Sequence, residues 1–389
     1  MAPFDPHQPQ SAQSPVRLTP GDAGAPLKEA IGLCLSGGGY RAMLFHVGTL
    51  IRLNEAKYLG KLDRISSVSG GSITAGVLGL HWKNLGVTAN APANISIVVD
   101  EIRKIASHTI DIGSVLEGVF GPSHVSTKIQ EAYDDMLFHG ATLQDLPDDP
   151  PRFVINATNV QSTVLWRFSK PFMADYRVGE VRHPRIPLAA AVAASSAFPP
   201  VLSPSELDLK KYGCVFEPDS GEDLRTEPYI SNAVLTDGGV YDNMGLETVW
   251  KSYQTVLVSD AGGHVEAEDS PHRDWARHAY RILDVVDNQV RSLRKRQVID
   301  AFTNKQRSGA YWGTRTDILN YGLANALPCP FTKTMDLARI PTRLKAIDNT
   351  QQEQLINWGY AVCDAAMRAW VDPTLPAPAD FPYPGPGVG

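Results

Sequence analysis

The chain has 389 residues with a formal net charge of -6, and 43% of its residues are hydrophobic. This composition is typical of a globular protein with a sizeable core, and the acidic balance disfavours a nucleic-acid binder, which would need a basic surface. The sequence contains no run of about 20 apolar residues that could span a bilayer. It also begins without the basic and apolar regions of a secretory signal. We therefore expect a cytoplasmic protein, or one that binds a membrane peripherally.

The two ends differ in composition from the rest of the chain. Residues 1–28 mix Pro, Gln, Ser and Gly without periodicity, and residues 373–389 are rich in proline. Such segments bury too little apolar surface to offset the entropy lost on ordering. We predict a flexible N-terminal segment and a disordered C-terminal tail.

Between these ends, short β-like runs alternate with helical stretches, which predicts an α/β fold with a largely parallel sheet. The first run, Gly32–Leu35, precedes three glycines and a stretch, Arg41–Asn54, whose apolar residues recur on one helical face. Further strands are predicted at 64–68, 153–158, 164–168, 233–236 and 255–259.

The C-terminal part, residues 263–372, is predicted to be mostly helical and to pack on the same domain. Its segment 272–307 holds nine Arg or Lys and four Asp. This charge pattern predicts either a solvated helix face or a surface that attracts anionic lipid head groups. We expect the segments 80–150 and 203–232 to line a binding pocket.

A serine follows the strand predicted at 64–68. Ser69 has the small Ser67 two positions before it, and Gly70 and Gly71 after it. A nucleophile elbow has this form, because its sharp turn from strand to helix needs small neighbours. The helix N-terminus also favours negative charge near the serine. Taken alone, the motif equally fits a turn that merely joins a strand to a helix.

Three glycines, Gly37, Gly38 and Gly39, separate the first strand from the helix that follows. Successive N–H groups at a helix start form a cup for anionic oxygen. The Lys and Ser/Thr of a phosphate-binding loop do not follow them, and the dinucleotide-binding pattern is met only loosely. A nucleotide site stays the less favoured alternative, and the predicted role is an oxyanion hole.

An aspartate ends the strand predicted at 233–236. Asp237 is followed by Gly238 and Gly239, which let the chain turn closely around it. Its carboxylate could act as general base toward a serine, with a pKa raised by the exclusion of water. The other interpretation is a structural or calcium-binding turn. Asp242 and Asn243 lack the spacing of a calcium-binding hand, so no metal is predicted.

These motifs together resemble those of patatin-like phospholipases, in particular bacterial-type members of that family. Ser36–Arg41, Ser67–Gly71 and Asp237–Gly239 are similar, in order, to the glycine-rich oxyanion loop, the serine elbow and the Asp-Gly-Gly/Ala motif of the family. Ala194–Pro200 resembles the Ala-Ser-x-Ala-x-Pro segment between elbow and aspartate. The resemblance covers residues 29–262, which we expect to form the catalytic domain.

The resemblance implies a three-layer α/β/α fold with a C-terminal helical extension, and a Ser–Asp dyad that hydrolyses acyl esters of lipids without a cofactor. Ser69 would attack the acyl carbonyl and Asp237 would take its proton. Two residues depart from the motifs, since Ser36 and Ser67 stand where many members have Asp and Gly. By the same motifs, the amides of Gly37, Gly38 and Gly39 would bind the oxyanion, with support from Arg41, Gly71, Gly238 and Gly239.

Two other functions stay open for the same motifs. The dyad could serve an acyltransferase or a thioesterase, or the fold could be a non-catalytic lipid-binding module. An ordinary hydrolase triad also needs a histidine. Candidates downstream of Asp237 are His264, His272 and His278, whereas His46 on the first helix has the context of a packed side chain. A dyad predicts that replacing any single histidine leaves activity.

Overall fold

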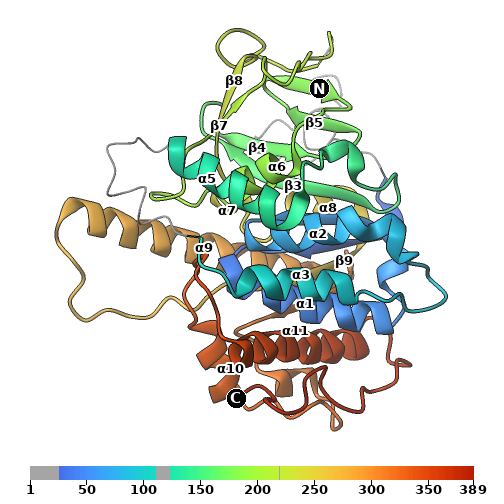
Figure 1. Ribbon diagram of the computed structural model, residues 1–389. Coiled ribbons are helices and arrows are strands. Elements are labelled where there is room, and N and C mark those ends of the chain that lie inside the picture. Colours follow the sequence, from blue (N-terminus) through green and yellow to red (C-terminus); the bar gives the residue numbers. More distant parts are fainter. Residues whose placement is uncertain (1–25, 111–122, 219) are drawn as a thin grey trace, which may run out of the picture.

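The computed structural model describes residues 26–110, 123–218 and 220–389, so most of the predicted flexible N-terminal segment lies outside the described residues. A ten-stranded sheet crosses the molecule, with helices on both of its faces (Figure 1). The predicted three-layer α/β/α fold is confirmed. All six predicted strands are present, and the helix predicted at 41–54 is confirmed as α1 (Gly39–Glu55).

Five neighbouring strands form the parallel part of the sheet. Their order is β10-β9-β1-β2-β3, and each pairs in parallel with the next. The outermost strand, β10, was not predicted and adds part of the C-terminal region to the sheet. The bounds are β1 (Lys28–Leu35), β2 (Leu62–Val68), β3 (Arg152–Asn159), β9 (Tyr253–Asp260) and β10 (Ser308–Gly313).

The sheet continues beyond β3 in antiparallel pairs, which the alternating pattern of the sequence did not predict. Strands β4, β5 and β6 follow one another from β3, while β7 pairs with β8 and β8 pairs with β3. The bounds are β4 (Val164–Phe168), β5 (Phe172–Asp175), β6 (Gly179–Arg182), β7 (Ser205–Asp208) and β8 (Asn232–Asp237).

The position of β8 has a direct consequence for the site. Strand β2 pairs with β3 as far as Asn156, and β8 pairs with β3 from Ala157 to Asn159. Because β2 runs parallel to β3 and β8 runs antiparallel to it, the C-terminal ends of β2 and β8 point toward each other. The residues that follow the two strands, Ser69 and the Asp237 turn, are thereby brought together.

Helices cover the sheet unequally. The main core lies on the side of α1 and α11, where Leu33 and Leu35 of β1 point, and a smaller cluster on the side of α8 and α9 takes Cys34. Alternation along a strand sends neighbouring side chains to opposite faces. The bounds of the other α-helices are α2 (Gly70–Leu85), α3 (Ser96–Ala106), α5 (Ser123–Tyr133), α6 (Leu188–Ser195), α7 (Gly239–Asp242), α8 (Glu247–Trp250), α9 (Trp275–Thr303), α10 (Phe331–Ala338) and α11 (Asn349–Trp370). Short 3-10 helices are η1 (Leu59–Lys61), η3 (Leu143–Asp145) and η4 (Ile318–Tyr321), and η2 (Asp134–Phe138) is a π-helix.

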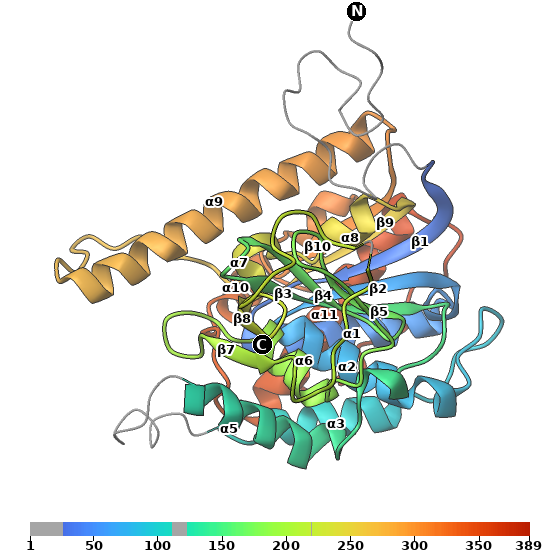
Figure 2. The same ribbon diagram turned by 90° about the horizontal axis from the view of Figure 1, so that it is seen from above.

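The C-terminal region packs on the same body but contains one projecting element. Helix α9 begins well outside the sheet and runs back across it, as Figure 2 shows from above. The proline-rich tail differs from its prediction as a disordered segment. Its backbone accepts hydrogen bonds from the Asn357 amide of α11 at Tyr383 and Gly387 (both 2.7 Å), and Phe381 and Val388 are buried. A few such contacts anchor a segment whose composition alone predicts no core.

Candidate active site

Ser69 occupies the turn between β2 and α2. Its backbone adopts φ 52° and ψ -125°, a conformation that is strained for a residue with a Cβ atom. The neighbouring glycines make this turn possible, because a Cβ on Gly70 would lie 2.2 Å from the carbonyl oxygen of Gly39, and one on Gly71 would lie 2.5 Å from that of Leu35. The serine side chain is only 7% exposed. The local structure is that of the predicted elbow.

Asp237 ends β8 and is fully buried. Its Oδ1 accepts a hydrogen bond from the Gly239 N–H at 2.7 Å, and its Oδ2 has no well-aligned hydrogen-bond partner among the described residues. Burial raises the pKa of this carboxyl to about 7, against the opposing effects of the Gly239 N–H and of the nearby Ser69 hydroxyl. A carboxyl that titrates near neutral pH, beside a serine hydroxyl, has the property required of a general base.

One residue of the segment Ala194–Pro200 ties the two turns together. The Ser195 carbonyl accepts hydrogen bonds from the Ser69 N–H at 3.1 Å and from the Gly238 N–H at 3.2 Å. Its hydroxyl accepts from the Ser69 N–H at 2.9 Å and donates to the carbonyl of Asn156 on β3 at 2.7 Å. The sequence motif indicated this segment but not its role. Ser195 is a positioning residue that fixes the serine turn relative to the aspartate turn.

The glycine loop lies against the serine. Gly38 and Gly39 have φ angles of +145° and +57°, which favour glycine, and their N–H groups begin α1, where no intrahelical acceptor exists. The prediction that all three amides bind an oxyanion does not fit Gly37. Its N–H already donates a hydrogen bond to the Asn243 carbonyl at 3.3 Å. A Cβ on Gly37 would lie 3.0 Å from the Ser69 Cβ, so this residue instead allows the close approach.

Two buried residues of α1, Arg41 and His46, form hydrogen bonds close to the glycine loop. The buried Arg41 donates to the carbonyls of Ala261 and Ile340 and to the Thr342 hydroxyl (3.0 Å). Burial, with help from nearby Arg291, lowers its pKa to about 9. His46 lies 2.9 Å from the carbonyl of Ser36, and burial lowers its pKa to about 4, so the imidazole is neutral near pH 7.

The two positions that depart from the family motifs have polar partners. Ser36 accepts a hydrogen bond from the Ala261 N–H at 2.7 Å, so its hydroxyl joins the glycine loop to the end of β9. Ser67 accepts one from the Ser72 hydroxyl at 3.0 Å, below the serine turn. Both hydroxyls are buried but paired, so neither substitution leaves an unsatisfied polar group there.

Helix α9 supplies a wall of the site that the sequence did not predict. Arg291 forms a buried ion pair with Asp260 at the end of β9, and Asn243 donates to the Asp287 carboxylate at 3.0 Å. Burial alone would raise the pKa of Asp260, but Arg291 and the Tyr311 hydroxyl outweigh it and lower the pKa to about 2. Arg291 is one of nine basic residues in the segment 272–307, and only the fold identifies its partner.

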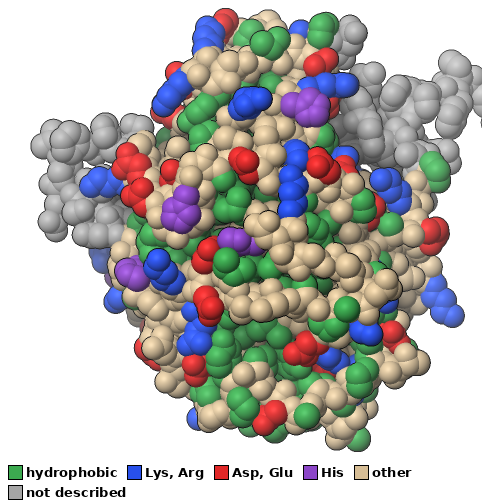
Figure 3. Space-filling view, turned by 45° about the vertical axis from the view of Figure 1, so that its right-hand side comes forward, with side chains coloured by type: hydrophobic (Ala, Val, Ile, Leu, Met, Phe, Trp, Pro, Cys, Tyr) green, Lys and Arg blue, Asp and Glu red, His purple; other side chains and the backbone are tan. Residues whose placement is uncertain are grey.

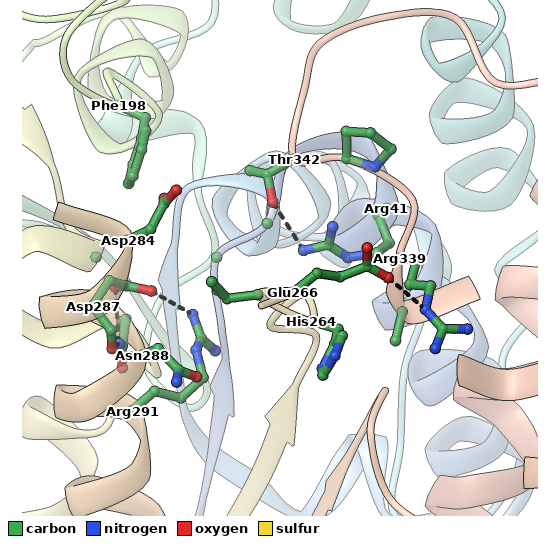
Figure 4. A pocket seen from close by; sticks show the side chains of 18 of the residues that line it. Arg41, Phe198, His264, Glu266, Asp284, Asp287, Asn288, Arg291, Arg339 and Thr342 are labelled. Atoms are coloured by element: carbon green, nitrogen blue, oxygen red, sulfur yellow. Dashed lines mark hydrogen bonds and ion pairs between the residues drawn. The ribbon is translucent and has the colours of Figure 1, made fainter. Parts of the chain in front are cut away.

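Ser69 and Asp237 line the same cavity, which has a volume of about 410 Å³. Figure 4 shows part of its lining, with Arg41 and Arg291 among the side chains drawn. Its other walls come from 263–268, from the inward side of α9 and from 338–343. An apolar groove of about 630 Å³ adjoins it, and the two share Phe198, Tyr280, Thr342 and Arg343. The expected lining segments are not the main ones. Within the described parts of 80–150 and 203–232, only Thr109 and Ile110 line either space.

The candidate histidines lie at different places. His264 lines the cavity with an exposed side chain (Figure 4), and its backbone N–H donates to the Ala338 carbonyl at 3.0 Å. His272 and His278 are exposed and do not line the cavity.

Within the described residues, no helix is long and apolar enough to cross a membrane. The basic segment 272–307 forms α9 and the turn after it. Four of its cations are in ion pairs, namely Arg277 with Asp274, Arg281 with Glu268, Arg291 with Asp260, and Arg294 with Glu247. Four of the nine cations in this segment therefore face acidic partners of this chain.

The fold and cavity define an α/β protein with a serine at a strand tip, a glycine-rich loop beside it and a buried aspartate opposite. Residues 33–250 match the family model of patatin-like phospholipases, and the chain belongs to that family. The prediction from the motifs is thereby confirmed. No curated protein matches the sequence.

Comparison with solved structures finds matches to human GIVD cytosolic phospholipase A2 and to VipD from Legionella pneumophila. The human enzyme matches at 12% identity over 60% of this chain and 45% of its own, with a TM-score of 0.39. In complex with methyl gamma-linolenyl fluorophosphonate it matches at 12% identity over 91% of this chain and 59% of its own, with a TM-score of 0.47. VipD matches at 15% identity over 85% and 67%, with a TM-score of 0.30. The chain thus covers about half of the human protein.

Proposed function

We propose that this protein is a serine acyl hydrolase that cleaves acyl esters of lipids through a dyad of Ser69 and Asp237. The observation that carries the proposal is that the strained Ser69 lies beside the buried carboxyl of Asp237. The pKa of this carboxyl is about 7, and its Oδ2 has no well-aligned hydrogen-bond partner among the described residues. Strain and a raised pKa each cost stability, and both are expected where they serve a reaction.

The reaction follows from these groups. The Ser69 hydroxyl attacks the acyl carbonyl while the Asp237 carboxylate takes its proton. The tetrahedral oxyanion is stabilised by the N–H groups of Gly38 and Gly39, together with the N-terminus of α2. The intermediate collapses, and the leaving alcohol takes the proton from Asp237. A water molecule then gives its proton to Asp237, attacks the acyl-enzyme and releases the acid, and the serine recovers its proton.

The apolar groove supports a lipid-like acyl substrate. Its apolar lining comes mainly from the segment Phe198–Leu202 and from Ile110 and Leu344, and it shares four lining residues with the cavity that contains Ser69. Hydrophobic lining with a few polar groups is the usual form of a site for an apolar ligand. An acyl chain in this groove would leave its carbonyl in the polar cavity that contains Ser69.

The test is active-site labelling of the full chain with a fluorophosphonate, followed by mass spectrometry of the labelled peptide. We expect one adduct, on Ser69, that is lost in Ser69→Ala. Labelling at another serine contradicts the proposed nucleophile. No labelling of a folded protein contradicts the proposed activity and favours the non-catalytic lipid-binding module.

Product analysis separates hydrolysis from transfer. The protein is incubated with phospholipid, lysophospholipid, acyl-CoA and short p-nitrophenyl esters, with and without an added alcohol. Free acid from oxygen esters in both conditions supports the hydrolase. Preferential cleavage of acyl-CoA indicates a thioesterase, and a new ester with the alcohol indicates an acyltransferase.

A peripheral contact with an anionic membrane stays a prediction. It rests on the basic segment 272–307, and the ion pairs that four cations of this segment form with acidic residues of the chain reduce the charge that could face a lipid surface. Sedimentation with vesicles of phosphatidylcholine, with and without phosphatidylglycerol, tests it. Binding that does not depend on the anionic lipid would rule out an electrostatic contact.

A further inference from the structure

Helix α9 exposes apolar side chains on its outward side. Trp275, Ile282, Val286 and Leu293 are 86%, 48%, 48% and 51% exposed. The opposite side of the same helix faces the catalytic cavity with Tyr280 and a set of charged residues. An amphipathic helix on a protein surface ordinarily shows the reverse arrangement, with its apolar side packed inward. This apolar surface is therefore one that a partner would cover.

The spacing of the outward residues is that of a helix–helix seam. Positions 275, 279, 282, 286, 289 and 293 alternate in steps of four and three, which is the period of the core positions of a coiled coil. We call these six residues the α9 seam, and they are Trp275, Ala279, Ile282, Val286, Gln289 and Leu293. A helix laid along this seam would meet a continuous surface of about five turns.

The α9 seam matches itself when it is reversed. In an antiparallel pair with a two-fold axis at position 284, Trp275 lies opposite Leu293, and Ala279 lies opposite Gln289. In the same pair, Ile282 of each copy lies opposite Val286 of the other. The bulky Trp275 thus faces the smaller Leu293, Ile282 faces the smaller Val286, and the small Ala279 faces the polar Gln289. A two-fold interface requires this kind of self-complementarity.

The charges of α9 favour a second copy over a lipid surface. Within 275–293 the charged residues are Arg277, Arg281, Asp284, Asp287 and Arg291, and every one of them lines the cavity or the groove. The seam is left without charge, whereas a lipid-binding helix ordinarily has basic residues beside its apolar face. The molecular face in Figure 3, by contrast, intersperses both signs of charge with apolar side chains. Two neutral seams can meet without like-charge repulsion.

The shape of the molecule leaves room for this contact. The first half of α9 projects beyond the sheet in both ribbon views, and all residues from Pro271 to Tyr280 are exposed (Figures 1 and 2). We propose that the α9 seam binds a second copy of this chain through an antiparallel pair of α9 helices. The inference does not depend on the proposed activity, because the seam faces away from the cavity.

Sedimentation equilibrium of the full chain, over a wide concentration range, tests the proposal. We expect a dimer for the wild type and a dissociation constant at least about a hundredfold weaker for the double variant Ile282→Gln with Val286→Gln, since the dimer loses four apolar side chains that face each other in two pairs. Leu319→Gln is the matched control, because Leu319 in η4 is also exposed (76%) but lies outside the seam. We expect this control to dimerise like the wild type.

Circular dichroism of each variant verifies that the fold is retained. A wild type that stays monomeric at every concentration overturns the proposal, as does a double variant that dimerises normally. A third result also overturns it: a monomeric wild type that binds phosphatidylcholine vesicles and loses this binding in the double variant. A lipid surface would then be the partner of the seam.

Discussion

The cavity has two walls that are built in different ways. The wall from the family-matched region 33–250 consists of the serine turn, the glycine loop and the aspartate turn, which meet through backbone contacts closer than a Cβ atom would allow. The part of α9 that lines the cavity is attached by polar contacts, which include the buried ion pair of Arg291 with Asp260 and the part-buried hydrogen bond of Asn243 with Asp287. We infer that the first wall fixes the chemistry, whereas the second can be altered without losing the reactive groups.

The largest effect is expected from the first wall. Ser69→Ala and Asp237→Asn should each lower ester hydrolysis by about a thousandfold or more, because the nucleophile and its base act as a unit. The measurement is the turnover of a soluble p-nitrophenyl ester, and its rate in the wild type should rise with pH to a plateau above about 7, as Asp237 ionises.

His264→Ala is the control for this comparison, since His264 lines the cavity on the other wall. A dyad predicts turnover within about threefold of the wild type. Loss of activity in a folded His264→Ala protein would establish a triad instead.

The next largest effect should come from the second wall. Arg291→Met leaves the buried Asp260 carboxylate without its cation, and breaking a buried pair in this way costs about 3 to 5 kcal/mol. Urea unfolding at pH 7 measures the loss. Because the folded pKa of Asp260 is lowered to about 2, its stabilising contribution is complete above the ordinary value of 3.8 and is lost as the pH falls through about 2.

The exposed Arg296 of the same helix provides a matched control, and Arg296→Met should change the free energy of unfolding by less than about 0.5 kcal/mol. Fluorophosphonate labelling of Ser69 should persist in Arg291→Met under folding conditions. Equal stabilities of the two variants would show that the ion pair does not hold the wall.

Asp237→Asn should make the protein more stable at alkaline pH. The folded pKa is raised from 3.8 to about 7, so the folded state holds a proton that the unfolded state has released, and stability falls as the pH rises between these values. Above pH 7 the penalty is complete, and its removal should add roughly 2 to 4 kcal/mol. Thermal unfolding at pH 4 and pH 8 measures the difference, and an equal gain at both would contradict the assignment.

The smallest effect concerns the backbone of the serine turn. Ser69→Gly should be more stable than Ser69→Ala by about 1 kcal/mol, because glycine adopts φ 52° without strain. Both variants lack the serine hydroxyl, so the difference between their free energies of unfolding, measured by chemical unfolding, reports the strain of the backbone at this position. Equal stabilities would mean that the turn is not strained.

Much of the site was readable from local sequence signals. Gly37–Gly39, Ser69 and Asp237 each follow a β-like run and stand beside small residues, so their turns could be predicted one at a time. The hydrogen bond from the Gly37 N–H to the Asn243 carbonyl could not be predicted, since the two residues are about 200 positions apart and no short pattern connects them. The same holds for Ser195. Its motif was visible in the sequence, but its carbonyl can accept from both the Ser69 and the Gly238 N–H groups only because β8 places Gly238 beside the serine turn.

The sequence by itself determined the fold class, the strands that carry the turns and the residues proposed for the reaction. These depend on periodicity, on β-branched runs and on the conformational freedom of glycine, all of which act over a few residues. Only the tertiary structure decided that β8 runs antiparallel to β3, so that Asp237 meets Ser69, and that α9 turns its charges inward and its seam outward. Those outcomes depend on packing and ion pairs between distant segments, which leave no local pattern in the chain.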